Sequence, residues 1–384
     1  MLNEKAIKIY LRKKFRNVSQ IKIKKLGAGV HGAGFLIEIK TPKGLKSYVV
    51  KTLMPEGFGH EYPSDRAGIF LLDMDEFKNL PKHVNAVDVL AEMKNGSIKS
   101  IGGGREYYLL MEKGEGQHYF HDLSGFAHKK RLEGPDMEKI KAMASYLAKI
   151  HSIKKDSKTL YWRKLRDTVG HGECLMGVFD IYPDKALPYK EMTDIIKKSV
   201  DWIYKLKPKY KRLSQIHGDF HPGNIWFKES VNRSIGQSVN RKNKKVSSLI
   251  HPFTHSPIHQ DVDFILLDRS RGPWGEPADD VTALTINYIF FSIKTYGKIT
   301  GIYLEALKLF FDEYVRLSGD AEIYKMLAPF FAFRGAVVAN PVFYPEVTPG
   351  QRELIFRFVN NVLDSERFAP EKIADLIQGK HKNL

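Results

Sequence analysis

Cysteine is almost missing from this sequence, because Cys174 is the single one in 384 residues. One cysteine cannot form an intramolecular disulfide, which excludes a disulfide-stabilised secreted scaffold and favours a reducing compartment. We expect Cys174 to be an inert, small apolar side chain. Residues 1–17 are basic but contain no uninterrupted apolar run, so they are not a secretory signal, and a cytoplasmic protein is expected.

Long hydrophobic runs are missing as well. No stretch of about 18 apolar residues occurs, and the nearest one, from Thr285 to Ile293, is interrupted by Asn287. No membrane-spanning helix is therefore expected, and this stretch is interpreted as a buried helix. The share of hydrophobic residues, 43%, is typical of a globular chain with a core.

Acidic residues are scarce relative to basic ones: 44 Asp and Glu accompany 61 Lys and Arg, which gives a net charge of +17. Such a charge favours anionic partners, including nucleic acids and lipid surfaces. The lysines are scattered, however, and neither an RNP-type strand nor zinc-finger spacing occurs. We therefore expect no specific nucleic-acid binding and interpret the excess charge as a solvated surface.

The first part of the chain has the patterns of strands. Apolar residues alternate with polar ones across residues 20–53, and further strands are predicted at 87–92 and 107–111. A helix is predicted at 73–80. Ahead of the strands, Asn3 is a plausible cap for a short amphipathic helix.

After residue 135 the pattern changes to helices. Ile140, Met143 and Leu147 recur at helical spacing, a second helix is predicted at about 190–206, and helices continue from about residue 279. A short two-strand region interrupts them. A strand-rich front followed by a helical back predicts an α+β protein with two lobes.

One segment does not fit either pattern. Residues 228–260 contain the sequence SVNR twice and carry six Lys or Arg against one Glu. This composition cannot bury much apolar surface, so a flexible insert is predicted at 229–260. Its three histidines recur every four residues, at His251, His255 and His259. Intervening prolines argue against the helix that would align them as metal ligands.

A glycine-rich sequence, GAGVHG, runs from Gly27 to Gly32. A dinucleotide-binding glycine motif must open a helix, whereas strand alternation follows here. A glycine-rich turn between two strands is the arrangement in which kinases bring backbone amides close to ATP phosphates. Gly27, Gly29 and Gly32 are therefore candidate ATP-binding residues, with an ordinary hairpin as the alternative.

Lys51 ends the next apolar strand, 19 residues after Gly32. This position suits a lysine that neutralises the α- and β-phosphates of ATP. Such a lysine needs a carboxylate partner from a nearby helix. Glu76 is the first candidate, with Asp65 and Asp73 behind it.

The most specific motif is HGDFHPGN, from His217 to Asn224, which is followed by apolar residues typical of a strand. In a phosphotransfer loop, Asp219 would accept or orient the substrate hydroxyl, and Asn224 would bind Mg²⁺ on the phosphates. Asp268 ends the next apolar strand, beyond the insert, and is placed to be a second Mg²⁺ ligand. A rival interpretation makes His217, Asp219 and His221 the metal ligands of a hydrolase.

Three motifs together resemble the aminoglycoside phosphotransferase and choline kinase group over roughly residues 20–300: HGDFHPGN, LLD ending at Asp268, and GEPADD ending at Asp280. The resemblance implies a bilobal, protein-kinase-like fold, with a β-rich, ATP-binding N-lobe at 1–113 and a mainly helical, catalytic C-lobe at 114–384. It also implies that Asp219 is the catalytic base.

The same resemblance assigns the remaining roles. Asn224 and Asp268 hold Mg²⁺, Lys51 contacts the phosphates, and Asp280 braces the catalytic loop. Backbone groups around Glu112 and Lys113 bind adenine at the interlobe hinge.

Residues 269–271, Arg-Ser-Arg, depart from the family, which usually has an acidic pair after the metal-binding aspartate. A neutral or anionic hydroxyl substrate is therefore as well suited as a polycationic aminoglycoside. The expected function is transfer of the γ-phosphoryl group of ATP, with Mg²⁺, to a hydroxyl of a small molecule such as a sugar or amino alcohol. A metal-dependent hydrolase and a catalytically silent kinase-like binding module remain the alternatives.

Overall fold

The computed structural model describes residues 2–28, 32–55, 59–77, 84–228, 262–269 and 271–379. The chain divides into two compact units, unit 1 at residues 1–111 and unit 2 at residues 112–384. The predicted insert at 229–260 with its histidines, and Gly29 of the glycine-rich turn, lie outside the described residues.

Unit 1 is built on an antiparallel meander of three strands, β1 (Gln20–Ala28), β2 (Gly32–Thr41) and β3 (Gly44–Leu53). The predicted strands across residues 20–53 are thus confirmed. The glycine-rich sequence joins β1 to β2, so it connects two strands rather than opening a helix.

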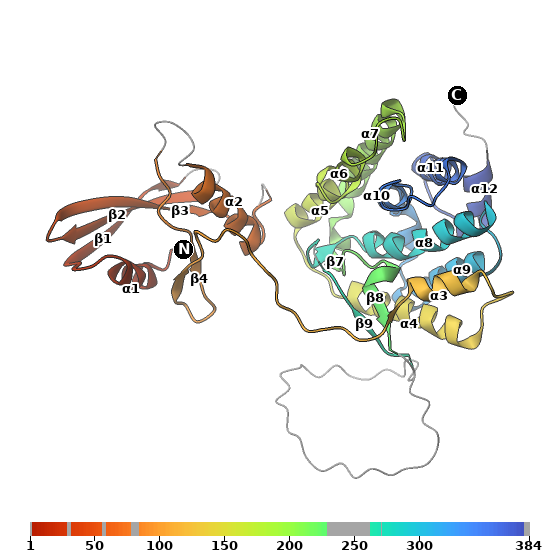
Figure 1. The fold of residues 1–384 in the computed structure, drawn as a ribbon, viewed down its shortest axis with the longest axis horizontal. Coiled ribbons are helices and arrows are strands. Elements are labelled where there is room, and N and C mark those ends of the chain that lie inside the picture. Colours follow the sequence, from red (N-terminus) through yellow and green to blue (C-terminus); the bar gives the residue numbers. More distant parts are fainter. Residues whose placement is uncertain are drawn as a thin grey trace, which may run out of the picture. The chain divides into compact units, whose positions relative to one another are not determined.

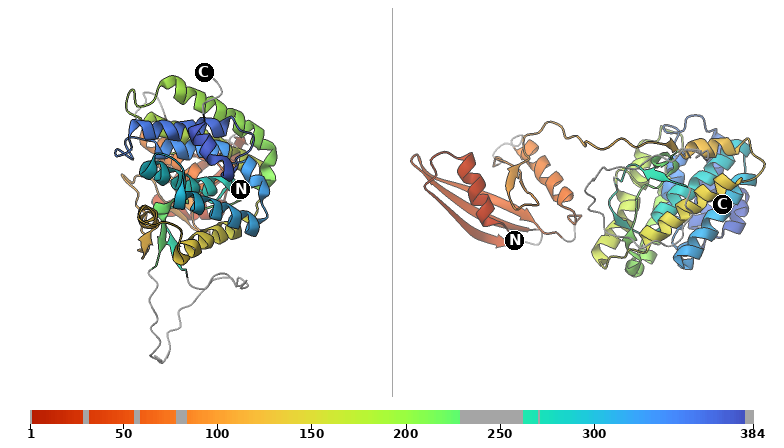
Figure 2. Two further views of the ribbon diagram at one scale, coloured as in Figure 1. Left: turned by 90° about the vertical axis from the view of Figure 1, so that its right-hand side faces the viewer. Right: turned by 90° about the horizontal axis from the view of Figure 1, so that it is seen from below.

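The helix α1 (Glu4–Lys14) lies along one face of this sheet (Figure 2). The side chain of Asn3 accepts a hydrogen bond from the Ala6 amide at 3.1 Å, which confirms the predicted cap. Ile7 and Leu11 are buried against Ile37 and other apolar side chains of the sheet. The alternation of apolar and polar residues therefore has its expected cause, a sheet covered on one face.

The other elements of unit 1 are α2 (Pro63–Glu76), β4 (Leu90–Glu92) and β5 (Ile98–Ser100). The helix predicted at 73–80 begins ten residues earlier in the structure. Pro63 suits the first helical turn, where its missing amide costs no hydrogen bond. Asp65 accepts a hydrogen bond from the Tyr62 amide at 2.7 Å, which also stabilises this early start.

The strand predicted at 107–111 is wrong. These residues are irregular, and their large side chains are exposed, 90% for Tyr108 and 97% for Leu110. In the described part of unit 1, β4 pairs with β5 instead, through a turn containing Gly96 at φ +77°. An apolar run becomes a strand only where a neighbour supplies hydrogen bonds, and the sequence pattern does not identify that neighbour.

Unit 2 is mainly helical. Its α-helices are α3 (Phe120–Phe126), α4 (Gly134–His151), α5 (Lys158–Gly170), α6 (Leu175–Asp180), α7 (Tyr189–Leu206), α8 (Ala278–Tyr296), α9 (Gly301–Ser318), α10 (Ala328–Val338), α11 (Pro349–Leu363) and α12 (Ile373–Gln378). Short 3₁₀ helices are η2 (Lys207–Arg212), η3 (Pro222–Asn224), η4 (Ala321–Lys325) and η5 (Pro370–Lys372). The helices predicted near 135–150 and at 190–206 are confirmed as α4 and α7.

Helix α8 forms the centre of unit 2, with α9 and α10 packed against it (Figure 1). Nearly all of its side chains from Ala278 to Ile293 are buried, which confirms the buried helix expected around Asn287. Among the described residues, no helix is long and apolar enough to cross a membrane. The chain as a whole is a mixture of helices and small sheets, as the α+β prediction requires.

Small sheets position the central loop of unit 2. The strand β8 (Ile225–Phe227) pairs with β6 (Gln117–His118) and with β9 (Phe264–Leu266), while β7 (Ser214–Gln215) pairs with β10 (Trp274–Gly275). Residues 217–224, between β7 and β8, are thereby held at both ends. We call residues 217–224 the central loop.

Candidate functional site

The central loop is fastened to the N-terminal end of α8 by Asp280. Its carboxylate accepts hydrogen bonds from the amides of His217 and Gly218, both at 2.7 Å. Gly218 has φ +89°, a conformation that side chains rarely adopt. His151 lies 3.2 Å from the same carboxylate, which is fully buried. Asp280 therefore braces the loop, as the sequence resemblance implied.

Asp219 is buried at the middle of the loop, with 8% of its surface exposed. Its Oδ1 accepts a hydrogen bond from Arg334 Nη1 at 2.6 Å. The Nη2 of Arg334 donates to Gly218 O at 3.0 Å and to Asp279 Oδ1 at 2.6 Å. A guanidinium on α10 thus joins the loop to the first turn of α8.

A second guanidinium, that of Arg271, lies 3.1 Å from the same Asp219 oxygen. We call Arg271 and Arg334 the arginine pair. Burial alone would raise the pKa of Asp219, but the positive charges of the arginine pair outweigh burial and lower the pKa to about 2. Asp219 is therefore an anion at every physiological pH.

Asn224 and Asp268 meet at the same end of the β8–β9 ladder. Ile225 pairs with Leu266, and the Leu267 amide donates to Asn224 O at 2.9 Å. Asp268 comes next and has φ +49°, an unusual conformation outside glycine. The proximity that the sequence suggested for these two residues is therefore present in the structure.

The chemistry of Asn224 and Asp268 fits a magnesium ion. Asn224 donates through Nδ2 to Asp219 O at 3.0 Å, which leaves its carbonyl oxygen for a ligand. Asp268 is exposed, and its carboxylate makes no ion pair or hydrogen bond to another described residue. An amide oxygen and a carboxylate are the hard oxygen ligands that Mg²⁺ prefers.

The histidines of the central loop support its backbone. His217 Nδ1 accepts from the Asp219 amide at 3.2 Å, and His221 Nδ1 accepts from the Gly223 amide at 3.1 Å. Burial lowers the pKa of His221, which favours the neutral ring. Within the described ranges, no three His, Cys, Asp or Glu side chains cluster as metal ligands. The hydrolase interpretation based on His217, Asp219 and His221 therefore has no geometric support.

Arg269 is exposed, but its guanidinium also contacts the backbone next to the central loop. Its Nη2 and Nε donate to Ile216 O at 2.8 and 3.1 Å, immediately before His217. The two arginines of the unusual Arg-Ser-Arg sequence therefore have different contacts: Arg269 binds loop backbone, and Arg271 contacts the Asp219 carboxylate.

The other predicted ATP-binding residues are divided between the units. In unit 1, Lys51 Nζ lies 3.9 Å from a carboxylate oxygen of Asp73 on α2, one of the two candidates named after Glu76. Gly27 and Gly32 flank the glycine-rich turn. In unit 2, Glu112 and Lys113 are exposed in an irregular segment.

Sequence reasoning missed the contacts of Arg334, Arg271 and Asp279 around Asp219. A signal for Arg334 was present, because it is a single charge within the apolar sequence FFAFRGAVVA of α10. A charge on a buried helix requires a buried counter-charge. The sequence does not identify that partner, since Asp219 and Arg334 are 115 residues apart.

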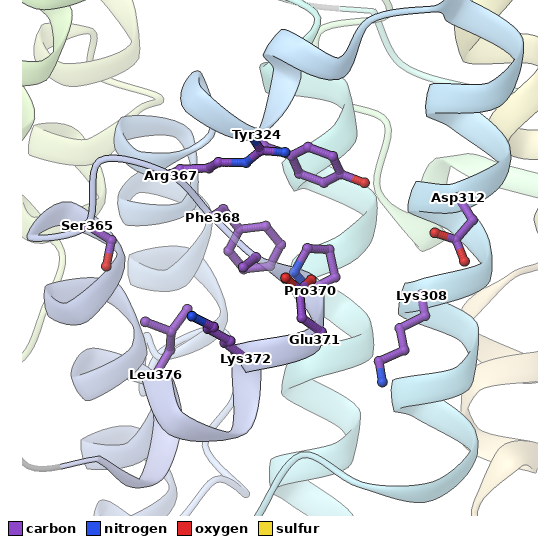
Figure 3. Close-up of a pocket in the computed structure, with 11 residues that line it drawn as sticks. Lys308, Asp312, Tyr324, Ser365, Arg367, Phe368, Pro370, Glu371, Lys372 and Leu376 are labelled. Atoms are coloured by element: carbon purple, nitrogen blue, oxygen red, sulfur yellow. The ribbon is translucent and has the colours of Figure 1, made fainter.

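A hollow of about 690 Å³ lies elsewhere in unit 2, between α9 and the segment from η4 to α12 (Figure 3). Lys308 and Asp312 line it on α9, and Arg367, Glu371 and Lys372 line it on the C-terminal segment. No residue of the central loop contributes to its wall. The hollow is therefore separate from the cluster around Asp219.

No protein-family model matches the chain. No curated protein matches it either. Solved structures that match include a choline kinase from Cryptosporidium parvum, which is 13% identical, with 97% of this chain and 92% of that chain covered and a TM-score of 0.31. An ethanolamine kinase from Plasmodium vivax is 14% identical, with coverage of 95% and 83% and a TM-score of 0.30. A glucosamine kinase in complex with glucosamine, ADP and inorganic phosphate is 11% identical, with coverage of 94% and 93% and a TM-score of 0.24.

Proposed function

We propose that this protein is a phosphotransferase that moves the γ-phosphoryl group of ATP to a hydroxyl group of a small molecule, with Mg²⁺. One observation carries the proposal: Asp219, Asn224 and Asp268 converge where the central loop meets the β8–β9 ladder. Phosphoryl transfer needs positioned oxygen ligands and neutralised charge more than covalent chemistry, and these three residues supply both.

Asp219 receives the acceptor hydroxyl. Its Oδ1 is taken up by the arginine pair, whereas its Oδ2 has only longer contacts, 3.5 Å to Asn224 Nδ2 and 3.8 Å to His221 Nε2. A hydroxyl that donates to Oδ2 is held with an oxygen lone pair directed at the phosphorus. Because Asp219 remains ionised, its main role is to orient the hydroxyl; a carboxylate with so low a pKa is a weak base.

The metal and phosphate ligands complete the proposal. Asn224 and Asp268 hold Mg²⁺, which when bound neutralises charge on the phosphate oxygens. Lys51 contacts the phosphates, backbone amides of the glycine-rich turn at Gly27, Gly29 and Gly32 approach them, and the segment at Glu112 and Lys113 receives adenine.

The charges around Asp219 bear on the acceptor. The arginine pair balances the carboxylates of Asp219 and Asp279, so these four side chains carry no net charge. A polycationic acceptor would need an excess of carboxylates beside Asp219. Neutral sugars, acidic sugars and amino alcohols are therefore tested first, with aminoglycosides for comparison.

The test is ADP release by the purified full chain, with Mg²⁺·ATP and each acceptor in turn. Asp219→Asn should reduce the rate by at least about 100-fold, because the amide cannot accept the hydroxyl in the same way. The matched control is Asp263→Asn, an exposed carboxylate paired with Lys228. Chelation of Mg²⁺ with EDTA should abolish the reaction.

Full activity of Asp219→Asn would contradict the proposed mechanism. If no acceptor, water included, supports ADP release while Mg²⁺·ATP binds, the protein is a silent binding module. Equal unfolding temperatures for the two variants would show that the loss of rate is not a loss of folding.

A further inference from the structure

The two oxygens of Asp219 have very different surroundings. Both guanidiniums of the arginine pair contact Oδ1, at 2.6 Å from Arg334 and 3.1 Å from Arg271. Among the described residues, Oδ2 has longer contacts, with Asn224 Nδ2 at 3.5 Å and His221 Nε2 at 3.8 Å. The arginine pair thus fixes the carboxylate through Oδ1, and Oδ2 remains available to a ligand.

Arg334 is far more tightly held than Arg271. It is 4% exposed, and both of its terminal nitrogens have partners, in Asp219, Gly218 and Asp279. Its guanidinium also lies 4.5 Å from the ring centroid of Phe333. Three of the five N–H groups of this guanidinium are thus donated within the cluster, and its buried Nε has no hydrogen-bond partner among the described residues.

Arg271 also lies over the Phe333 ring, 4.9 Å from its centroid, but its polar contacts are weaker. Its side chain is 14% exposed against 5% for Arg334, and its second contact, to Gly218 O, is long at 3.5 Å. Its longer and looser contacts make Arg271 a secondary support, so the orientation of Asp219 depends chiefly on Arg334.

We propose that Arg334 is the positioning residue of the proposed phosphotransferase: it fixes Asp219 through Oδ1, so that Oδ2 faces the acceptor hydroxyl. This inference rests on the proposed function. Arg334 touches neither nucleotide nor acceptor and acts only through Asp219. The contact links two helices, because Asp279 lies in the first turn of α8 and Arg334 lies on α10.

Removing Arg334 leaves the Asp219 side chain free to rotate, which lowers the rate. A lysine at position 334 keeps the positive charge but cannot hold Asp219 and Asp279 through two separate nitrogens. Alanine loses both the charge and these contacts.

The experiment measures ADP release by the full chain with Mg²⁺·ATP and water as the acceptor. Arg334→Lys should lower kcat by about 100-fold, with KM for ATP unchanged. Arg334→Ala should lower kcat at least as much. Added guanidinium at low millimolar concentration should restore part of the rate of Arg334→Ala, but not that of Asp219→Asn.

Val338→Ala is the structural control, because Val338 is buried on the same helix, α10, and has no polar group to contact Asp219. If the variants at 334 act only by loosening the packing of α10, Val338→Ala will lower kcat as much and guanidinium will rescue nothing. That result overturns the inference. Tryptophan fluorescence verifies that Arg334→Lys is folded. If this folded variant has the kcat of the wild type, the inference is overturned, even if the alanine variant does not fold.

Failure of the proposed function has a different signature. If the wild-type chain releases no ADP with water or with any acceptor, the phosphotransferase proposal fails and the inference fails with it. If the wild type turns over and the variants at 334 match it, only the inference fails.

Discussion

Asp219 is a buried anion, and its ionisation has a measurable effect on the free energy of unfolding. Its pKa falls from the usual 3.8 to about 2 in the folded protein. A carboxyl group whose pKa is lowered on folding stabilises the folded state at pH values above its unfolded-state pKa, here 3.8. This contribution is lost as the pH falls through about 2. The difference corresponds to about 2 kcal/mol.

We therefore expect the free energy of unfolding of unit 2 to fall more steeply between pH 5 and pH 2 in the wild type than in Asp219→Asn. Urea denaturation followed by tryptophan fluorescence measures this, because all four tryptophans, Trp162, Trp202, Trp226 and Trp274, lie in unit 2. Parallel curves for the two proteins would contradict the assignment of the lowered pKa to Asp219.

At the scale of elements, the glycine-rich hairpin contains two glycines with different reasons to be glycine. A Cβ on Gly32 would lie 1.8 Å from Thr52 O on the neighbouring strand β3. A Cβ on Gly27 would meet no atom of the described residues within 4 Å. The close approach of two strands thus requires glycine at position 32, whereas no contact with a described residue requires it at position 27.

Gly32→Ala should destabilise unit 1 by roughly 1–3 kcal/mol, because the strands must move apart. Gly27→Ala should leave stability unchanged and weaken ATP binding if its backbone approaches the phosphates. Hydrogen exchange of the β2 and β3 amides reports the stability, and calorimetry with Mg²⁺·ATP reports the binding. Equal exchange in the two variants would contradict the steric argument.

The elements also separate what local sequence determines from what it does not. The periodicity around Met143 predicted α4, and alternation predicted β1 to β3, since each pattern reports one buried face. The run at 107–111 has a strand-like composition but is exposed and irregular. Composition reports the preference of a segment, whereas a strand also needs a partner supplied from elsewhere in the chain.

The central loop was predictable because its residues are close together in sequence, from His217 to Asn224. Asp268 was predictable only because a second apolar strand ended there. The contacts of Arg334 were not predictable, because its partners on the loop and on α8 come together only after the helices of unit 2 have packed.

At the scale of the whole molecule, the pairing of β8 with β9 brings the two ends of the predicted insert together. The Lys228 amide donates to Asp263 O at 3.0 Å, and Phe227 pairs with Phe264, so the two ends are already adjacent. Replacing residues 229–260 with a short Gly-Ser linker should therefore preserve ADP release. Shortening the loop should stabilise unit 2 by at most about 1–2 kcal/mol, since closure entropy grows slowly with length.

Tryptophan fluorescence during thermal unfolding, together with ADP release, checks this expectation. A fall of many degrees in unfolding temperature would show that the insert contributes to folding. A loss of ADP release at unchanged stability would show that it contributes to the reaction.

The ion pairs of Arg334 also have a consequence for protein synthesis. Asp219 leaves the ribosome 115 residues before Arg334, the more buried of its two counter-charges. At roughly 5–20 residues per second, translation takes on the order of 10 s to supply Arg334. Until then Asp219 and Asp279 have no buried cation from α10, and burying them would be unfavourable. Unit 2 therefore acquires its final packing late in translation, and a ribosome paused before residue 334 should present a nascent chain that is more accessible to chaperones and proteases.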